Sequence, residues 1–300
     1  MNTDARTSNE FVTGGLDGIK KHTRKRRVII TIAVLLLLII AELIRSNNYI
    51  ETDEYTYLSS DLPKSFDNVK IVQISDYHNH GGMLDDRLIK KIKEQSPDYI
   101  FLTGDIADSV RTDIGKANAF LEKVSKIADC YLVWGNHDYE ISDSDREKMK
   151  LCCEQNGITV LENDYVKLER GGDSVLLVGT DTILDAGRVQ SLMNSLPKER
   201  FVMWLHHYPE DFEEIVKQSG EHGAQADLVF CGHAHGGLIR LPFIGGLYAP
   251  GQGFLPDYTS GRYNSGDSSM ILSRGVGNSG WTLRIFDPFH LPVVTLKSSK

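Results

Sequence analysis

Residues 227–237 read Asp-Leu-Val-Phe-Cys-Gly-His-Ala-His-Gly-Gly, an apolar run followed by two histidines between glycines. The run has the composition of a buried parallel strand, and the polar group falls where that strand would end. In open α/β sheets, ligands bind outside the carboxyl ends of the strands. Two imidazoles two residues apart, with glycines that permit close approach, suit a metal ion. This stretch therefore predicts an α/β fold with a metal site at a strand end.

Four further segments repeat this pattern earlier in the chain. In each, polar residues follow a short apolar run: Asp76 and His78 after 69–75, Asp105 after 99–102, Asn136 and His137 after 131–134, and His206 and His207 after 201–205. The carboxyl ends of parallel strands meet at one edge of a sheet, so these groups are expected to lie close together. The order of the five segments is a stronger functional signal than any single residue in it.

The residue types in these segments suit metal-assisted phosphate chemistry. Residues i and i+2 of an extended segment point the same way, so Asp76 and His78 can reach one metal. Adjacent strand residues face opposite sides, so one of His206 and His207 reaches the site, and His207 is favoured. Mixed Asp, Asn and His ligands suit Mn, Fe or Zn. Two such cations can clamp the oxygens of a phosphoryl group.

The motifs Asp-x-His, Gly-Asp, Gly-Asn-His-Asp, a strand-ending His and Gly-His-x-His, in this order, resemble the calcineurin-like metallophosphoesterase family. The resemblance covers about residues 69–297. The runs 232–242 and 273–277 resemble the membrane-associated bacterial phosphodiesterase branch of that family. The resemblance implies a four-layer α/β/β/α sandwich and a site with two metals. One metal would take Asp76, His78, Asp105 and His235, and the other Asp105, Asn136, His207 and His233.

In this family Asp105 would bridge the two metals, and His137, the residue after the Asn ligand, contacts the scissile phosphate. His137 is therefore the expected catalytic residue, as a phosphate contact or as a proton donor to the leaving group. The sequence departs from the family pattern at Tyr77, where the family often has a smaller or aliphatic residue. His80, which follows this motif, is either a phosphate contact or a loop residue.

The rest of the body shows the alternation of apolar runs and helical periodicity expected of one α/β domain over residues 69–300. With 41% hydrophobic residues the chain can bury a large core. Helical spacing occurs over residues 84–95, 112–128 and 142–155, and residues 158–180 predict an antiparallel meander. The Gly/Pro/Tyr-rich stretch 236–263 predicts a long loop near the site, and residues 270–276 and 281–296 predict closing strands. The four cysteines fit no disulfide framework or metal knuckle and are expected to be free thiols.

Charge is distributed unevenly along the chain. Of the 33 basic and 41 acidic residues, 8 and 4 fall in residues 1–45, which leaves residues 46–300 with a net charge of −12. An acidic body lacks the basic surface expected of a nucleic-acid binder, so no nucleic acid is expected as a partner. Bound metals would then be the main source of positive field for a phosphate substrate.

The N-terminal part of the chain predicts a membrane segment. Residues 1–27 form a basic tail, residues 28–44 are almost wholly aliphatic, and residues 45–68 are polar and predict a tether. A run of about 17 apolar residues is at the short end of a membrane span. A cleavable signal, of the twin-arginine kind because of Arg26 and Arg27, is the alternative to a signal-anchor helix. The basic residues before the span put the N-terminus in the cytoplasm and the body outside.

These features together predict a membrane-anchored phosphoesterase. It would hydrolyse a phosphate ester, with a phosphodiester favoured, by a hydroxide that bridges two divalent metals. The anchor favours a substrate at the membrane surface, such as a phospholipid or a lipid-linked pyrophosphate. The alternative is an ectodomain that binds a phosphorylated lipid or cell-wall ligand without turning it over. A nuclease is a third reading, disfavoured by the acidic body.

Overall fold

The computed structural model describes residues 4–180, 186–280 and 282–299, and the chain divides into two units. The first unit ends at Arg45 and is formed by the helix α1 (Asp4–Ser46), and the second is the body, which begins with Ser46, the last residue of that helix. Within α1, the 23 residues Arg24–Ser46 are long and apolar enough to cross a membrane. This segment contains the predicted span 28–44.

The body is built on two six-stranded mixed sheets. The first has the order β1-β16-β2-β3-β4-β5, with β1 (Ile50–Ser59), β16 (Phe289–Ser298), β2 (Lys70–Ile74), β3 (Tyr99–Thr103), β4 (Asp129–Val133) and β5 (Thr159–Val160). The second has the order β14-β15-β9-β8-β7-β6, with β14 (Gly261–Ser265), β15 (Ser268–Leu272), β9 (Leu228–Cys231), β8 (Val202–Leu205), β7 (Asp173–Gly179) and β6 (Asp164–Arg170). The strands β2 to β5 are parallel, and so are β15, β9, β8 and β7.

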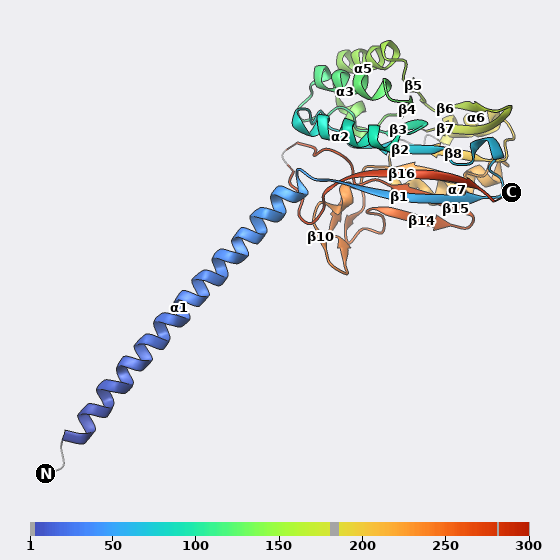
Figure 1. The fold of residues 1–300 in the computed structure, drawn as a ribbon. Helices are drawn as coiled ribbons and strands as arrows, with labels where there is room; N and C mark the ends of the chain where they lie inside the picture. The colour runs from blue at the N-terminus through green and yellow to red at the C-terminus, as the bar shows by residue number, and fades with distance from the viewer. Residues whose placement is uncertain (1–3, 181–185, 281, 300) are drawn as a thin grey trace. The chain divides into compact units, whose positions relative to one another are not determined.

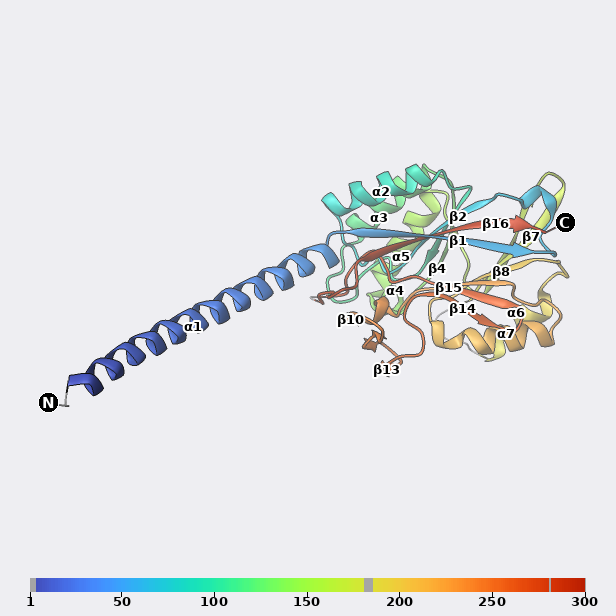
Figure 2. The ribbon, with the colours of Figure 1, turned by 60° about the horizontal axis from the view of Figure 1, so that its bottom comes forward.

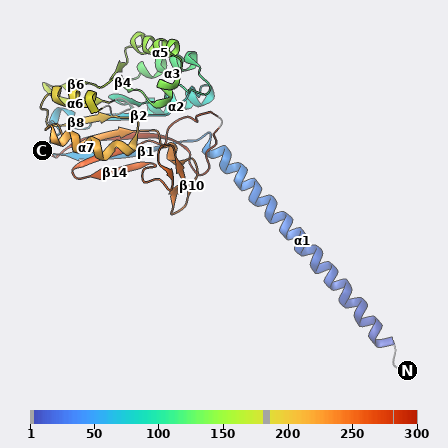
Figure 3. The ribbon, with the colours of Figure 1, turned by 180° about the vertical axis from the view of Figure 1, so that it is seen from behind.

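Helices cover the outer face of each sheet, which gives the predicted four-layer α/β/β/α sandwich (Figure 1). The first sheet carries α2 (Met83–Gln95), α3 (Ile114–Ser125) and α5 (Asp143–Gln155). The second carries α6 (Ala186–Ser195) and α7 (Phe212–Glu221). Figures 2 and 3 show the two groups of helices on opposite sides of the strands. A short helix, α4 (Asn136–Glu140), follows β4.

The apolar runs of the sequence are strands that are buried on both faces. In β3, Tyr99 and Phe101 pack into the core between the sheets, whereas Ile100 and Leu102 pack under the helices. This two-residue alternation is that of a pleated strand. Because both faces are covered, such strands are apolar at nearly every position, which is why the five runs are visible in the sequence.

Two segments differ from the prediction. Residues 45–68 do not form a tether, because Ile50–Ser59 is β1 and pairs along its whole length with β16. Charged and polar residues surround the buried positions Ile50 and Tyr57 of this edge strand, so the sequence shows no apolar run there. The stretch 236–263 is not one loop either. It contains two small hairpins, β10 (Arg240–Leu241) with β11 (Gly245–Gly246) and β12 (Tyr248–Ala249) with β13 (Gly253–Phe254).

The place of β1 in the core gives a stability prediction. The Tyr57 side chain is 6% exposed, its hydroxyl donates to the Asp227 carbonyl at 3.0 Å, and its ring lies 5.8 Å from that of Phe201. We expect Tyr57→Ala to lower the free energy of unfolding by about 3 kcal/mol. The neighbouring Leu58 is 64% exposed, so Leu58→Ala should change it by less than about 0.5 kcal/mol. Denaturant titration of both variants measures this, and equal effects would contradict the role of β1 as a packed strand.

Candidate metal centre

The five polar segments of the sequence meet at the carboxyl ends of five strands from both sheets. Strands β2, β3 and β4 of the first sheet and β8 and β9 of the second each end beside the same point. The histidines and aspartates predicted as ligands are at most 6% exposed: Asp76, His78, Asp105, His207, His233 and His235. Asn136 and His137, at the start of α4, are partly exposed.

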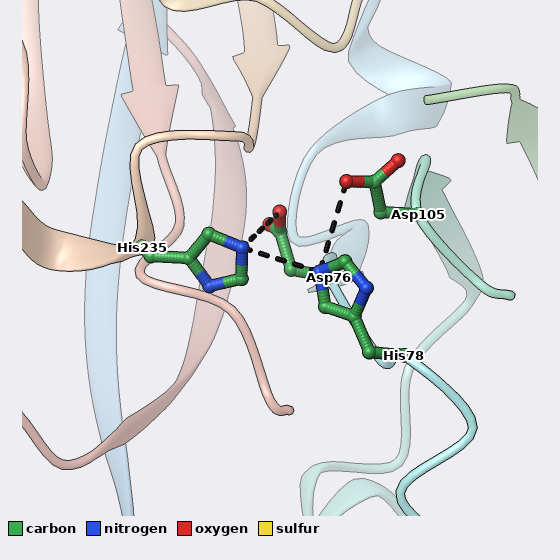
Figure 4. Close-up of side chains that lie close together, drawn as sticks. All are labelled: Asp76, His78, Asp105 and His235. Carbon is green, nitrogen blue, oxygen red and sulfur yellow. Dashed lines mark hydrogen bonds and ion pairs between the residues drawn. The ribbon is translucent and has the colours of Figure 1, made fainter. Parts of the chain in front are cut away.

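The first group of potential ligands is Asp76, His78, Asp105 and His235 (Figure 4). The Nε2 atom of His235 lies 3.2 Å from that of His78 and 3.4 Å from Oδ1 of Asp76. The Nε2 atom of His78 lies 3.7 Å from Oδ2 of Asp105. These atoms surround one small volume, as ligands of a single cation do.

The second group is Asp105, His207 and His233. The Nε2 atom of His207 lies 3.3 Å from Oδ2 of Asp105, the same oxygen that faces His78. Asp105 therefore belongs to both groups. Asn136 begins α4 directly after β4, the neighbour of β3 in the first sheet.

Several of these buried atoms have no hydrogen-bond partner. They are Asp105 Oδ2, His207 Nε2, Asn136 Oδ1 and His78 Nδ1. A buried polar atom without a partner costs free energy, and native proteins rarely leave one. The His78 atom is on the side of the ring turned toward Asp108, away from Asp105 and His235. The other three are oxygen and imidazole donors of predicted ligands, which fit the coordination chemistry of divalent metals.

The backbone of the site is strained where the side chains converge. Five residues have positive φ angles although none is glycine: Asp76 (53°), His78 (49°), Asp105 (55°), His233 (68°) and His235 (46°). The left-handed region costs an L-residue about 1–2 kcal/mol. Strain of this kind persists at functional sites because the surrounding structure holds it.

Two glycines make room for the carboxylates. A Cβ atom on Gly135 would lie 2.1 Å from Oδ1 of Asp105, and one on Gly232 would lie 1.8 Å from the Ser75 hydroxyl and 2.7 Å from Oδ2 of Asp76. All three distances are too short for a side chain at either position. The glycines of Gly-Asn-His-Asp and Gly-His-x-His therefore allow neighbouring loops to approach the two aspartates.

Burial and charge together set the protonation of the site. Burial alone would raise the pKa of Asp105, but the imidazoles of His207 and His78 pull that pKa below its ordinary value. For His207 burial acts to lower the pKa, and the carboxylates of Asp105 and Asp76 outweigh it and raise the pKa to about 10. Burial lowers the pKa of His78 to about 4 and that of His233 to about 3. Asp105 and His207 thus form a pair of opposite charges, with the neutral imidazoles of His78 and His233 around it.

Backbone and side-chain hydrogen bonds orient the ligands. The Nδ1 atom of His207 donates its proton to the Thr103 carbonyl at 2.7 Å, so Nε2 is the atom that faces Asp105. Nε2 can offer its lone pair to a cation once His207 gives up its second proton. The amide of His137 donates to Oδ1 of Asp105 at 2.8 Å, and the amide of His233 donates to Asp76. The second of these bonds joins the two sheets at the site.

Two supporting residues were not predicted from the sequence. The buried carboxylate of Asp138 accepts from the amides of Gly135, Ala107 and Ile106, and so ties the loops after β3 and β4 together. Burial raises the pKa of Asp138 to about 7. The Asp that closes Gly-Asn-His-Asp was a visible signal for this role.

The second is Arg284, which is fully buried and donates to Nδ1 of His235 at 3.0 Å. A neutral His235 then carries its proton on Nε2, the atom that faces Asp76 and His78. Binding of a cation at Nε2 requires that proton to leave or the contact with Arg284 to change. No pattern around Arg284 in the sequence pointed to the site.

The histidine pair at the end of β8 divides as the strand geometry requires. His207 faces Asp105, whereas His206 lies 2.9 Å from the Thr180 hydroxyl and 2.9 Å from a carboxylate oxygen of Asp211. Both nitrogens of His206 therefore have partners away from the metal groups. Tyr77 also points away, since its ring stacks on Phe120 with a centroid distance of 4.0 Å.

A cavity of about 320 Å³ opens beside the first group. Its wall includes His78, His80, Arg111, Lys116 and Leu283. His80 thus lies at the cavity, next to two cationic side chains, and its ring also packs edge-on against Phe289. The volume is at the lower end of that of small-molecule sites. The four cysteines are free, as expected, and lie outside the potential ligand groups.

The fold and the site define a class: an enzyme that uses divalent metals to act on phosphate esters. Comparison with known sequences agrees with it. The sequence profile described as calcineurin-like phosphoesterase matches residues 69–237, and this chain belongs to that family. It is therefore a metal-dependent phosphoester hydrolase.

Three relatives illustrate the range of similarity. The metallophosphoesterase YkuE of Bacillus subtilis (strain 168), named as uncharacterized, is 31% identical over 83% of this chain and 86% of its own length. The phosphodiesterase YaeI of Escherichia coli (strain K12) is 31% identical over 62% of this chain and 65% of its own. A transmembrane protein with metallophosphoesterase domain from Danio rerio is 26% identical over 79% of this chain and 55% of its own.

The close approach at Gly135 gives a prediction. A methyl group there would push Asp105 away, so we expect Gly135→Ala to reduce the metal content of the purified protein more than about tenfold. Elemental analysis of the full chain measures this. Gly115→Ala in α3 is the control, because a Cβ there meets an atom only at 3.4 Å and alanine favours a helix. Full metal content in Gly135→Ala would contradict the steric account.

Proposed function

We propose that this chain is a membrane-anchored phosphodiesterase with two divalent metals in its site. The observation that carries the proposal is the set of unpartnered buried ligand atoms around Asp105, drawn from both sheets. The Escherichia coli relative YaeI is named a phosphodiesterase, which supports a diester over a monoester.

The proposed ligands follow the two groups. Asp76, His78, Asp105 and His235 would hold one cation, and Asp105, Asn136, His207 and His233 the other, with Asp105 bridging. Mn, Fe or Zn suits this mixture of oxygen and nitrogen donors. When bound, two such cations supply an activated water and neutralise the charge on the phosphoryl oxygens.

His137 is the proposed catalytic residue. The amide of Ser109 donates to its Nδ1 at 3.1 Å, so a neutral ring carries its proton on Nε2. That nitrogen lies 3.3 Å from the Ser279 hydroxyl, and the His137 ring meets the His78 ring edge-on at a centroid distance of 4.7 Å. His137 can therefore donate its Nε2 proton to a phosphoryl oxygen or to the leaving alkoxide.

The cavity beside His78 is the proposed place for the rest of the substrate. Arg111 and Lys116 bring two positive charges to its wall, in a body whose net charge is negative. Each also has a carboxylate nearby, Asp108 at 3.4 Å and Asp113 at 3.6 Å. The positive side chains of Arg111 and Lys116 can hold an anionic substrate next to the metals, while the acidic surface of the body repels longer polyanions.

The membrane anchor is the third part of the proposal. The apolar part of α1 follows directly on the basic residues 20–27, which favours a cytoplasmic N-terminus and a body outside the membrane. A transmembrane relative with the same kind of domain supports the anchoring. An enzyme held there meets lipid-linked phosphate esters at high local concentration, so we propose these as substrates.

Removal of metal tests the proposal directly. We expect exhaustive chelation of the full-length protein to abolish hydrolysis of bis(p-nitrophenyl) phosphate, and added Mn²⁺ to restore it, because the bound cations would supply the activated water. Release of p-nitrophenol measures both steps, with circular dichroism as the control for folding. Hydrolysis that survives chelation would rule out the metal mechanism.

Substitution of single ligands tests the sharing of Asp105. We expect wild-type protein to bind two metal equivalents, His207→Gln about one, and Asp105→Asn less than one, since Asp105 serves both cations. His206→Gln is the matched control. The His206 imidazole has its partners, Thr180 and Asp211, outside the two ligand groups, so this substitution should leave two metal equivalents bound. Elemental analysis decides, and equal metal contents in Asp105→Asn and His206→Gln would contradict the bridging role.

A further inference from the structure

Exposed apolar side chains gather at one end of the body. Six of them define what we call the apolar rim: Phe243, Ile244, Phe254, Leu255, Leu283 and Phe286, which are between 49% and 108% exposed. Single exposed apolar residues are ordinary, but a group of large ones marks a binding surface.

Hydrogen bonds hold the segments of the rim together. The amide of Arg240, at the base of the β10–β11 hairpin, donates to the Ile285 carbonyl at 3.0 Å, and the Leu247 amide donates to the Ile239 carbonyl at 2.9 Å. The Leu255 amide donates to the Leu247 carbonyl, which joins the β12–β13 hairpin to the same unit. Figure 2 shows β10 and β13 near one another at the edge of the body.

The chemistry of the rim is unusual for this chain. Residues 241–256 contain no charged side chain, although 25% of all residues in the chain are charged. Phe243, Leu255 and Phe286 have positive φ angles of 69°, 53° and 54°. Glycine would adopt these angles without strain, so the chain holds bulky apolar groups outward at a conformational cost. Contact of these side chains with water would not offset that conformational cost, whereas contact with an apolar partner would.

The start of the body lies at this surface. The Ser46 hydroxyl accepts from the Asp287 amide at 3.1 Å, and the Asn47 side chain donates to the Arg284 carbonyl at 2.9 Å. Residue 46 is therefore tied to the loop that carries Leu283 and Phe286. The apolar span ends at residue 44, so covalent connectivity alone keeps this loop within a few residues of a membrane surface.

From these observations we infer that the apolar rim inserts into the lipid bilayer surface and makes a second membrane contact beside the anchor. Uncharged hairpin tips that carry Phe, Leu and Ile can insert into the interfacial region of a bilayer and bury their side chains among the acyl chains. Leu283 lies both in the rim and in the wall of the cavity next to His78, so the inserted rim would open the cavity toward lipid. This inference rests on the proposed anchoring and narrows the substrate to the phosphate ester of a lipid.

The test places a tryptophan at the rim of the full-length protein. Phe243→Trp is reconstituted in nanodiscs at one copy each, with phospholipids brominated on their acyl chains, which quench tryptophan on contact. All proteins in this test carry Trp281→Phe, so that the reference keeps only Trp134 and Trp204, which are buried. We expect the quenching to exceed that of this reference. Leu151→Trp on α5, at a position that is 50% exposed, is the matched control and should add no quenching. Phe254→Trp repeats the measurement on the second hairpin.

The outcomes separate the inference from the proposed function. Wild-type protein that fails to float with lipid would overturn the anchoring itself. Flotation with no excess quenching in either rim variant would overturn the inference alone, whether or not the diester is hydrolysed. A concentration-dependent blue shift of the rim tryptophan in detergent, without quenching in nanodiscs, would assign the rim to a second copy of this chain and likewise overturn it.

Discussion

The buried carboxylate of Asp105 is the interaction on which the site depends. One of its oxygens accepts from the His137 amide, and the other faces both His78 and His207 without a hydrogen bond. A charge in a place without water is stable only beside opposite charge, and here that charge comes from the second sheet through His207. Oδ2 of Asp105 thus lies between the end of β2 in the first sheet and the end of β8 in the second, and it belongs to both potential metal groups.

Much of this arrangement was predictable because it depends on short apolar runs. Strands covered on both faces leave an unbroken signal, and the polar residues that follow them stand out, as Asp105 does after β3. The twofold alternation of strand side chains also predicted that only one of His206 and His207 faces the site, and the structure has His207 facing Asp105. The three helices over the first sheet agree with the periodicity to within a few residues.

Other features were invisible for a physical reason. β1 is an edge strand with one open side, so its polar residues conceal the packing of Tyr57. Arg284 reaches His235 from a loop far along the chain, and a contact between residues 49 positions apart leaves no periodic trace. The hairpins β10–β11 and β12–β13 are two residues deep, too short for any alternation to appear. Local sequence patterns predict helices and strands, whereas contacts between irregular segments become known only from the three-dimensional structure.

The position of β16 has a consequence for how this protein is made. β16 follows the other described strands in the sequence, yet it lies between β1 and β2. Until residues 289–298 have left the ribosome, β1 has no neighbour in this sheet and β2 has an open edge. The nascent chain must therefore keep β1 unpaired until β16 has been made, and the sheet closes only when β16 inserts between β1 and β2. Loss of β16 would then detach β1 from the sheet as well.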